Sequence, residues 1–262
     1  MSRLKAVFSP NRAVSAGTLK LVAAVQLGLF IAFWAMSPLE VLPRPLEVLG
    51  AFQKLWFEEG LGQELLISLG VNLQALLLAT LISLGLSYLT VVPFFRPLAA
   101  AVAKGRFLGL VGLTFVFTLT VGGGRPLKVS LLVFGMTVFF VTSMADVVAS
   151  IPRDQFDYAR TLRMGEWRAV HEVVVLGTLD KAIEVLRQNA AIGWMMLTMV
   201  EGIVRSEGGV GAMLLNQNKH FHLAEVFATQ IVILSVGVLQ DWAIGVFRGL
   251  ICPYAELTLE RR

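Results

Sequence analysis

The sequence predicts an all-α, polytopic membrane protein with six transmembrane helices. Of its 262 residues, 56% are hydrophobic and only 15% are charged, and the mean hydropathy is +0.74. A soluble domain carries about 25% charged residues and has too little interior for so much apolar surface. The charged residues also lie between long apolar stretches. These observations exclude a disordered chain and a coiled coil, and the single cysteine excludes a disulfide scaffold.

Six stretches are long and apolar enough to cross about 30 Å of hydrocarbon, for which a helix needs about 20 residues. They are 21–39, 65–92, 107–124, 128–147, 182–204 and 224–248. The last two include charged residues such as Glu184 and Asp241. Charges inside a span are tolerated only where they face protein, water or headgroups, so we expect these side chains to have such partners.

The N-terminal arm, residues 1–20, contains four basic residues and precedes the first span. With this arm in the cytoplasm, 16 of the 22 Lys and Arg residues lie on the cytoplasmic side and six on the other. Basic residues are enriched on the cytoplasmic side of membrane proteins. We therefore expect both termini in the cytoplasm, a retained first helix, and a single transmembrane domain over 21–262.

A short amphipathic helix is expected between the first two spans. Leu46, Leu49, Phe52 and Leu55 recur every three residues, which places them on one helical face. Two positions suit such a helix: it can lie flat on the outer membrane interface, or it can cap the helix bundle.

The segment of about 153–176, between the fourth and fifth spans, predicts two short cytoplasmic helices. Pro152 ends the preceding helix, and Asp154 is placed to cap the next one. We expect Gly165 to adopt the left-handed conformation that ends a short helix. A second amphipathic piece then begins near Trp167.

This helix pair suits either of two surroundings. Its periodicity is compatible with helices that rest on lipid headgroups, but such helices are usually mostly basic. Here the polar face carries acids as well as bases, including Asp154, Asp157, Glu166 and Glu172. The small Ala159 also favours docking into a groove on another protein.

Asp157-Tyr158-Ala159, followed by Gly165, resembles the Glu-Ala-Ala…Gly cytoplasmic loop of ATP-binding-cassette (ABC) importer permeases. The stretch 193–211 resembles the fifth span and outer loop of the nitrate, sulfonate and taurine branch of that family. The sequence departs from the family at Asp157 and Tyr158, where Glu and Ala are usual, and at Gly177, where Pro is usual.

The resemblance implies a binding-protein-dependent permease subunit in the bacterial cytoplasmic (inner) membrane, importing a small nitrate-, sulfonate- or taurine-like solute. Its partners would be a cytoplasmic ABC ATPase subunit that holds the ATP, a second permease copy as a homodimer, an extracytoplasmic substrate-binding protein and the lipid bilayer. The segment 153–176 would be the coupling helix pair. Its expected contact residues are Asp157, Tyr158, Ala159, Leu162 and Gly165.

Two further sets of residues are candidates for the transport function. Buried polar groups in a membrane helix are costly and are often functional. In the fifth span, Trp and Met side chains lie near such polar groups. Packing would explain the Trp and Met side chains equally well. The candidate pathway residues are Asn189, Trp194, Met195, Met196 and Glu201. The candidate outer gate or docking loop contains Gly208, Gly209 and Gly211.

Motifs of enzymes and cofactor sites are missing from the sequence. It contains no Gly-x-x-x-x-Gly-Lys-Ser/Thr loop, so we expect no ATP or other cofactor on this chain. It also lacks Gly-x-Ser-x-Gly and His-Glu-x-x-His, so no catalytic residue is expected. The pair His220 and His222 offers too few ligands for a metal site. No basic patch is interleaved with aromatics, so we expect no nucleic acid partner.

Two other functions are compatible with the same spans. The chain could be an ATP-independent channel or facilitator, in which 146–187 would lie against lipid. It could also be a structural membrane subunit of a larger complex.

Overall fold

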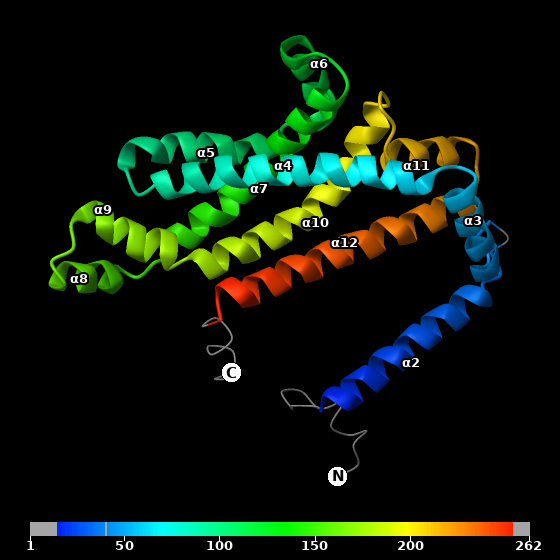
Figure 1. Ribbon diagram of the computed structural model, residues 1–262, viewed down its shortest axis with the longest axis horizontal. Helices are drawn as coiled ribbons and strands as arrows, with labels where there is room; N and C mark the ends of the chain where they lie inside the picture. Colours follow the sequence, from blue (N-terminus) through cyan, green and yellow to red (C-terminus); the bar gives the residue numbers. More distant parts are fainter. Residues whose placement is uncertain (1–14, 40, 254–262) are drawn as a thin grey trace.

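The computed structural model describes residues 15–39 and 41–253, and every regular element in that part of the chain is helical (Figure 1). The predicted all-α class is therefore confirmed for these residues. Two 3₁₀ turns, Pro93–Phe95 and Gly105–Phe107, flank α5, and a π-helical segment, Val170–Leu176, follows α9. The α-helices are α2 (Ala16–Ala35), α3 (Pro45–Phe57), α4 (Leu61–Leu89), α5 (Arg96–Lys104), α6 (Leu110–Val121), α7 (Arg125–Ala149), α8 (Arg153–Thr161), α9 (Glu166–Ala169), α10 (Leu179–Ile203), α11 (Val210–Lys219) and α12 (Leu223–Ile251).

Four of these helices are long and apolar enough to cross a membrane. They are α2 over Gly17–Ala35, α4, α7 and α12. They fall on four of the predicted spans: 21–39, 65–92, 128–147 and 224–248. Their length and composition indicate a multi-pass membrane protein.

The other two predicted spans differ from simple crossing helices. The stretch 107–124 contains α6, which has only 12 residues and meets the preceding segment Pro93–Phe107 at 116°. If that bent pair counts as one span, the total is five. The stretch 182–204 lies in α10, whose 25 residues include five charged side chains. The count of six spans therefore stays a prediction.

The centre of the fold is formed by α4, α7 and α10, which pack against one another. Ala75 and Ala79 of α4 are fully buried there, together with Leu131 and Met136 of α7 and Leu197 of α10. Small side chains let membrane helices approach closely, and the resulting van der Waals contact holds them together. On the other side of α10, α12 packs along its length.

The amphipathic helix expected near 46–56 is α3, and it packs against α12. Val48, Ala51 and Leu55 form its buried face, whereas Leu46 on the opposite side is 80% exposed. The helix thus caps the bundle with one face and leaves a second apolar face uncovered. The first feature fits a cap on the bundle, and the second fits a helix on the outer membrane interface.

An ion pair fixes α3 to the start of α12. Lys54 Nζ donates to Glu225 Oε1 at 2.6 Å and also lies 3.1 Å from Glu59 Oε1. The hydrogen bond to Glu225 raises the pKa of Lys54 above its ordinary value of 10.5. Lys54 therefore stays charged at every physiological pH.

Helix α2 stands apart from the bundle except at its last turn, where Trp34 stacks against Phe227 of α12. From its junction with α3, it extends away from the other helices (Figure 1). None of its apolar span is buried, and Phe33 is 78% exposed. An all-round apolar surface of this kind requires lipid or another protein around it.

Candidate functional site

The segment between α7 and α10 forms a protruding structure, residues 153–177, which we call the knob (Figure 1). Its first helix, α8, has nine residues and begins after Pro152, which occupies the N-cap position. The prediction that Asp154 is the cap was therefore wrong. Asp154 lies in the first turn instead, where its negative charge favours the positive end of the helix.

The turn from α8 to α9 is built differently from the predicted one. Gly165 is not left-handed: its φ is −65° and its ψ is 154°, an extended conformation at the N-cap of α9. The left-handed residue is Arg163, with φ 55°. Met164 N donates to Ala159 O at 3.2 Å, so the helix ends at a turn through Arg163 and not at Gly165.

The five expected contact residues of the knob lie in different places. Ala159 is only 3% exposed, because α8 packs against α9 and the π-helical segment. Tyr158 and Leu162 are 67% and 53% exposed. Asp157 is also exposed and pairs with Arg160 at 3.1 Å. Tyr158 and Leu162 therefore offer an apolar surface, while Ala159 belongs to the interior of the knob.

A π-helical turn connects the knob to α10. Gly177 N donates to Glu172 O at 3.0 Å, which is the five-residue spacing of a π-helix. A Cβ at Gly177 would collide with the carbonyl oxygen of Val173. The buried Thr178 then donates its hydroxyl to Val174 O at 2.6 Å. The glycine is thus required by the turn, whereas no atom lies within 4 Å of the Cβ that Gly165 would carry.

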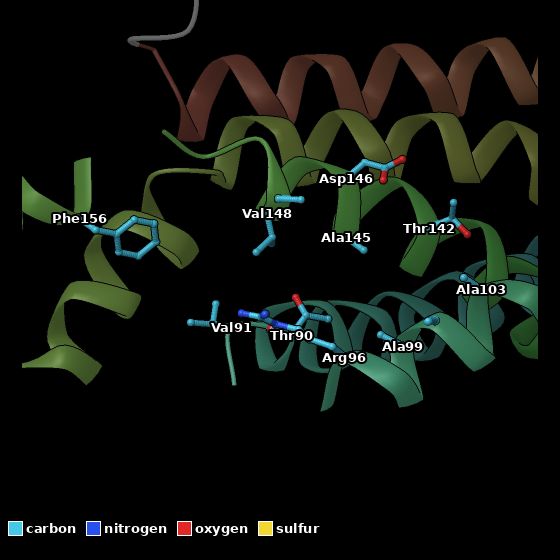
Figure 2. Close-up of a pocket in the computed structure, with 12 residues that line it drawn as sticks. Thr90, Val91, Arg96, Ala99, Ala103, Thr142, Ala145, Asp146, Val148 and Phe156 are labelled. Atoms are coloured by element: carbon cyan, nitrogen blue, oxygen red, sulfur yellow. The ribbon is translucent and has the colours of Figure 1, made fainter. Parts of the chain in front are cut away.

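A cavity of about 550 Å³ separates part of the knob from the helix bundle. Figure 2 shows Phe156 of α8 at one end of this cavity, with Ala99 and Ala103 of α5 on one wall and Ala145 of α7 on the other. Because alanine side chains fill little space, Phe156 has room beside it. Of the residues of the knob, Phe156 is the one that lines this cavity.

At the opposite end of α10, Glu201 is completely buried. Ser68 of α4 donates its hydroxyl to both carboxylate oxygens, at 2.7 and 2.9 Å. Gly211 N donates to Glu201 Oε2 at 2.9 Å. A predicted pathway residue and a predicted gate residue are therefore parts of one cluster.

Two further charged side chains fix the same loop. Gly209 N donates to Glu64 Oε2, and Lys128 Nζ donates to Gly208 O at 2.6 Å. Gly209 has φ 111°, and a Cβ there would collide with the Glu201 carboxylate, so only glycine fits. We call Glu64, Ser68, Lys128 and Glu201 with the loop 208–211 the outer cluster. Glu64, Ser68 and Lys128 were not predicted as site residues, although Glu64 and Lys128 adjoin apolar stretches where a charge is unusual.

The remaining pathway candidates do not share one surface. Asn189 is 1% exposed and donates to Val185 O within its own helix. Trp194 is 5% exposed, and Met196 packs partly buried against the core. Met195 is 67% exposed and points away from them. Only Asn189 and Trp194 belong to the polar interior.

The structure adds two amide side chains that the sequence analysis missed. Gln240 Oε1 accepts hydrogen bonds from Trp194 Nε1 at 2.7 Å and from Asn72 Nδ2 at 3.1 Å. A cavity of about 400 Å³ lies between α10 and α12, and Trp194 lines it together with Asp241 and Gln230. The signal in the sequence is an isolated Asn or Gln inside an apolar stretch.

The charges that the last two predicted spans include do face protein. Arg187 of α10 donates two hydrogen bonds of 2.6 Å to the Asp241 carboxylate of α12. Arg248 of α12 donates to Glu184 of α10 at 3.1 Å. Two cross-helix ion pairs therefore join α10 to α12, and paired charges are the form in which membrane helices tolerate them.

Comparison with known protein-family models and with curated proteins finds no match to this chain. In the part of the chain that the structure describes, no three or more His, Cys, Asp or Glu side chains gather closely enough to hold a metal ion. The knob, the outer cluster and the α10–α12 cavity are therefore the features of the described residues that bear on function.

Proposed function

We propose that this chain is the permease subunit of an ATP-driven importer in the bacterial inner membrane, acting with a separate ABC ATPase subunit. The observation that carries the proposal is the knob, a small protruding unit between the 25-residue helices α7 and α10. Tyr158 and Leu162 are exposed on it. Apolar side chains on a protruding short helix suit a groove on another protein. The resemblance of 157–165 to the coupling loop of ABC permeases identifies the kind of partner.

Helix α10 would carry the signal across the membrane. Its first turn follows the π-helical turn of the knob, and its last turn holds Glu201 in the outer cluster. A force on α8 therefore acts, through Gly177, on the same helix that anchors the outer loop 208–211. Rigid movement of one helix against its neighbours is a common form of transport-linked change.

The pathway would run along the cavity of about 400 Å³ between α10 and α12, which is lined by Trp194, whose indole N–H donates to Gln240. That volume suits a small solute, such as a nitrate-, sulfonate- or taurine-like compound. A second copy of the chain would complete the pathway and cover part of the uncovered α2. The loop 208–211 would be the docking or gating surface for an extracytoplasmic binding protein, and both termini would be cytoplasmic.

Co-purification tests the proposal. The tagged full chain is expressed in its native host, extracted in mild detergent and assayed for ATP hydrolysis in the eluate. The wild type should carry an ATPase subunit. Replacing Tyr158 and Leu162 together by Ala should lower the co-purified ATPase activity about tenfold or more, because exposed apolar anchors dominate most interfaces.

A matched control uses another aromatic residue and another leucine at the same spacing of four positions. Phe94 and Leu98, 81% and 52% exposed, lie in the expected cytoplasmic stretch between α4 and α6. Replacing both by Ala should leave the co-purified activity unchanged. An eluate without ATPase activity would contradict the proposal. Solute flux without ATP would then favour a channel or facilitator, and absence of flux would favour a structural membrane subunit.

A further inference from the structure

A polar pocket of about 370 Å³ lies beside the outer loop, between the start of α4 and α11. Its wall includes the carboxylates of Glu59 and Glu64 and the carboxamides of Asn216 and Gln217. No Lys or Arg side chain lines it. Among the ion pairs of the described residues, Glu59 pairs with Lys54 at 3.1 Å whereas Glu64 pairs with none, so the Glu64 carboxylate makes this pocket a place for a cationic group.

The start of α11 does not offer the pocket an anion site. The first N–H groups of a helix usually attract anions. Here Gly209 N donates to Glu64, Val210 N to Ser68 Oγ at 2.8 Å, and Gly211 N to Glu201 at 2.9 Å. The protein's own oxygens therefore use these three donors. Glu64 accepts the hydrogen bond from Gly209 N through Oε2, so its Oε1 is available to a ligand.

Gln217 supplies an independent sign of a missing ligand. Its side chain is 3% exposed, and Thr229 Oγ1 donates to its Oε1 at 3.0 Å, while its Nε2 has no partner. The two ends of a carboxamide are interchangeable, because the Thr229 hydroxyl can either donate or accept. Turning the amide keeps the bond to Thr229 and presents Oε1 as a third acceptor beside the two carboxylates. A buried amide atom without a partner is otherwise costly.

We infer that this pocket binds the ammonium group of a small organic solute. The free oxygen of Glu64, an oxygen of the Glu59 carboxylate that it shares with Lys54, and an amide oxygen are three acceptors for the three N–H donors of a primary ammonium. Among the described residues, no group of three or more His, Cys, Asp or Glu side chains that could hold a metal ion occurs.

The inference deepens the proposed function and rests on it for one point only, that the bound molecule is a solute on its way inward. It narrows the solute class to amines and zwitterions with a free ammonium group, and it argues against a simple inorganic anion. Binding itself requires neither ATP nor a partner. A failure of ATPase coupling would therefore leave the pocket standing, and a failure of binding would leave the coupling intact.

Calorimetric titration of the purified full chain in detergent tests the site, with n-butylammonium as the probe and butyrate as its anionic counterpart. The wild type should bind n-butylammonium saturably and should bind butyrate at least about tenfold more weakly. Glu59→Gln and Glu64→Gln should each weaken n-butylammonium binding about tenfold. Glu64→Gln retains an oxygen for Gly209 N, so the loop should keep its fold. Gln217→Met should also weaken binding.

Glu58→Gln is the matched control, because Glu58 is exposed, adjoins Glu59 in sequence and does not line the pocket. It should leave the affinity unchanged. Equal binding of butyrate, or unchanged n-butylammonium binding in both Glu59→Gln and Glu64→Gln, would overturn the inference. A capped lysine pentapeptide that binds more than tenfold tighter than n-butylammonium would also overturn it, because the pocket would then serve a protein partner.

Discussion

Glu201 shows how a single side chain organises the outer end of the protein. It has no exposed surface, yet its carboxylate accepts from Ser68 Oγ and Gly211 N. A carboxylate can be buried only if such donors replace the water it loses. Lys128, whose Nζ donates to Gly208 O at 2.6 Å, adds a positive charge to the same cluster. Glu201 therefore holds the loop 208–211 together with Glu64, Ser68 and Lys128.

Replacing Glu201 by Ala should destabilise the chain by about 1–3 kcal/mol, because Ser68 and Gly211 would keep buried donors without an acceptor. Glu201→Gln should cost less, since one side-chain oxygen remains to accept. The measurement is thermal unfolding of the detergent-solubilised chain. Glu58→Ala, at an exposed position, is the control and should change the midpoint little. Wild-type stability in Glu201→Ala would show that the cluster does not hold the loop.

The sequence predicted Glu201 and Gly211 as members of two separate sites. That both belong to one hydrogen-bonded cluster could not be predicted, because Ser68 and Glu64 of this cluster come from a helix more than 100 positions earlier in the chain. Met195, a predicted pathway residue, is 67% exposed, whereas its neighbour Trp194 is buried, and the sequence did not separate the two. A stretch that is apolar on every side carries no helical phase from which to read the buried face.

At the scale of elements, the π-helical turn before α10 is the most distinctive part of the fold. π-helical turns are rare and are often found at functional sites. This one places Gly177 against the carbonyl oxygen of Val173 and joins the knob to a 25-residue helix. Gly177 is therefore the position without room for a side chain, and Gly165 is an ordinary extended residue.

Gly177→Ala should destabilise the chain by about 1–3 kcal/mol, the range for a methyl group forced into occupied space. It should also lower ATP hydrolysis by the co-purified complex, because the knob would be displaced relative to α10. Gly165→Ala is the matched control, since open space surrounds that position, and it should behave as wild type. The opposite ranking in thermal unfolding and ATPase assays would place the hinge at Gly165.

Element boundaries were predictable where charges bracket an apolar run, as for α4 and α7. Boundaries were harder to predict in 107–124. There Leu108 and Gly109 adopt an extended backbone, which separates α6 from the helical segment that contains α5. Gly105 and Gly109 mark the break in the sequence. Hydropathy alone does not register it, because residues on both sides are apolar.

At the scale of the molecule, composition sufficed for the helical class and the long apolar helices, but not for their arrangement. The cross-helix pairs Arg187–Asp241 and Arg248–Glu184 depend on how α10 faces α12. The isolation of α2 depends on the direction in which α3 leaves it (Figure 1). Neither is encoded in a local pattern of residues.

The distribution of basic residues makes a topological prediction for the whole chain. Cys252, the single cysteine, is buried and can be replaced by Ser to give a background without thiols. In intact cells, a membrane-impermeant maleimide should label Ser206→Cys, an exposed position in the outer loop, and should not label Thr161→Cys in the knob. Lysis should expose Thr161→Cys to labelling. Reversed labelling of the two positions would invert the proposed orientation.

The most direct test of the central claim, that the knob couples this chain to an ATPase, is photocrosslinking from the knob in native membranes. A benzophenone amino acid at position 158 should yield a crosslinked product that is also labelled by an azido-ATP analogue. The same probe at position 94, another exposed aromatic site, should not yield it. A product from position 158 that contains only lipid, or no nucleotide-binding protein, would contradict the account.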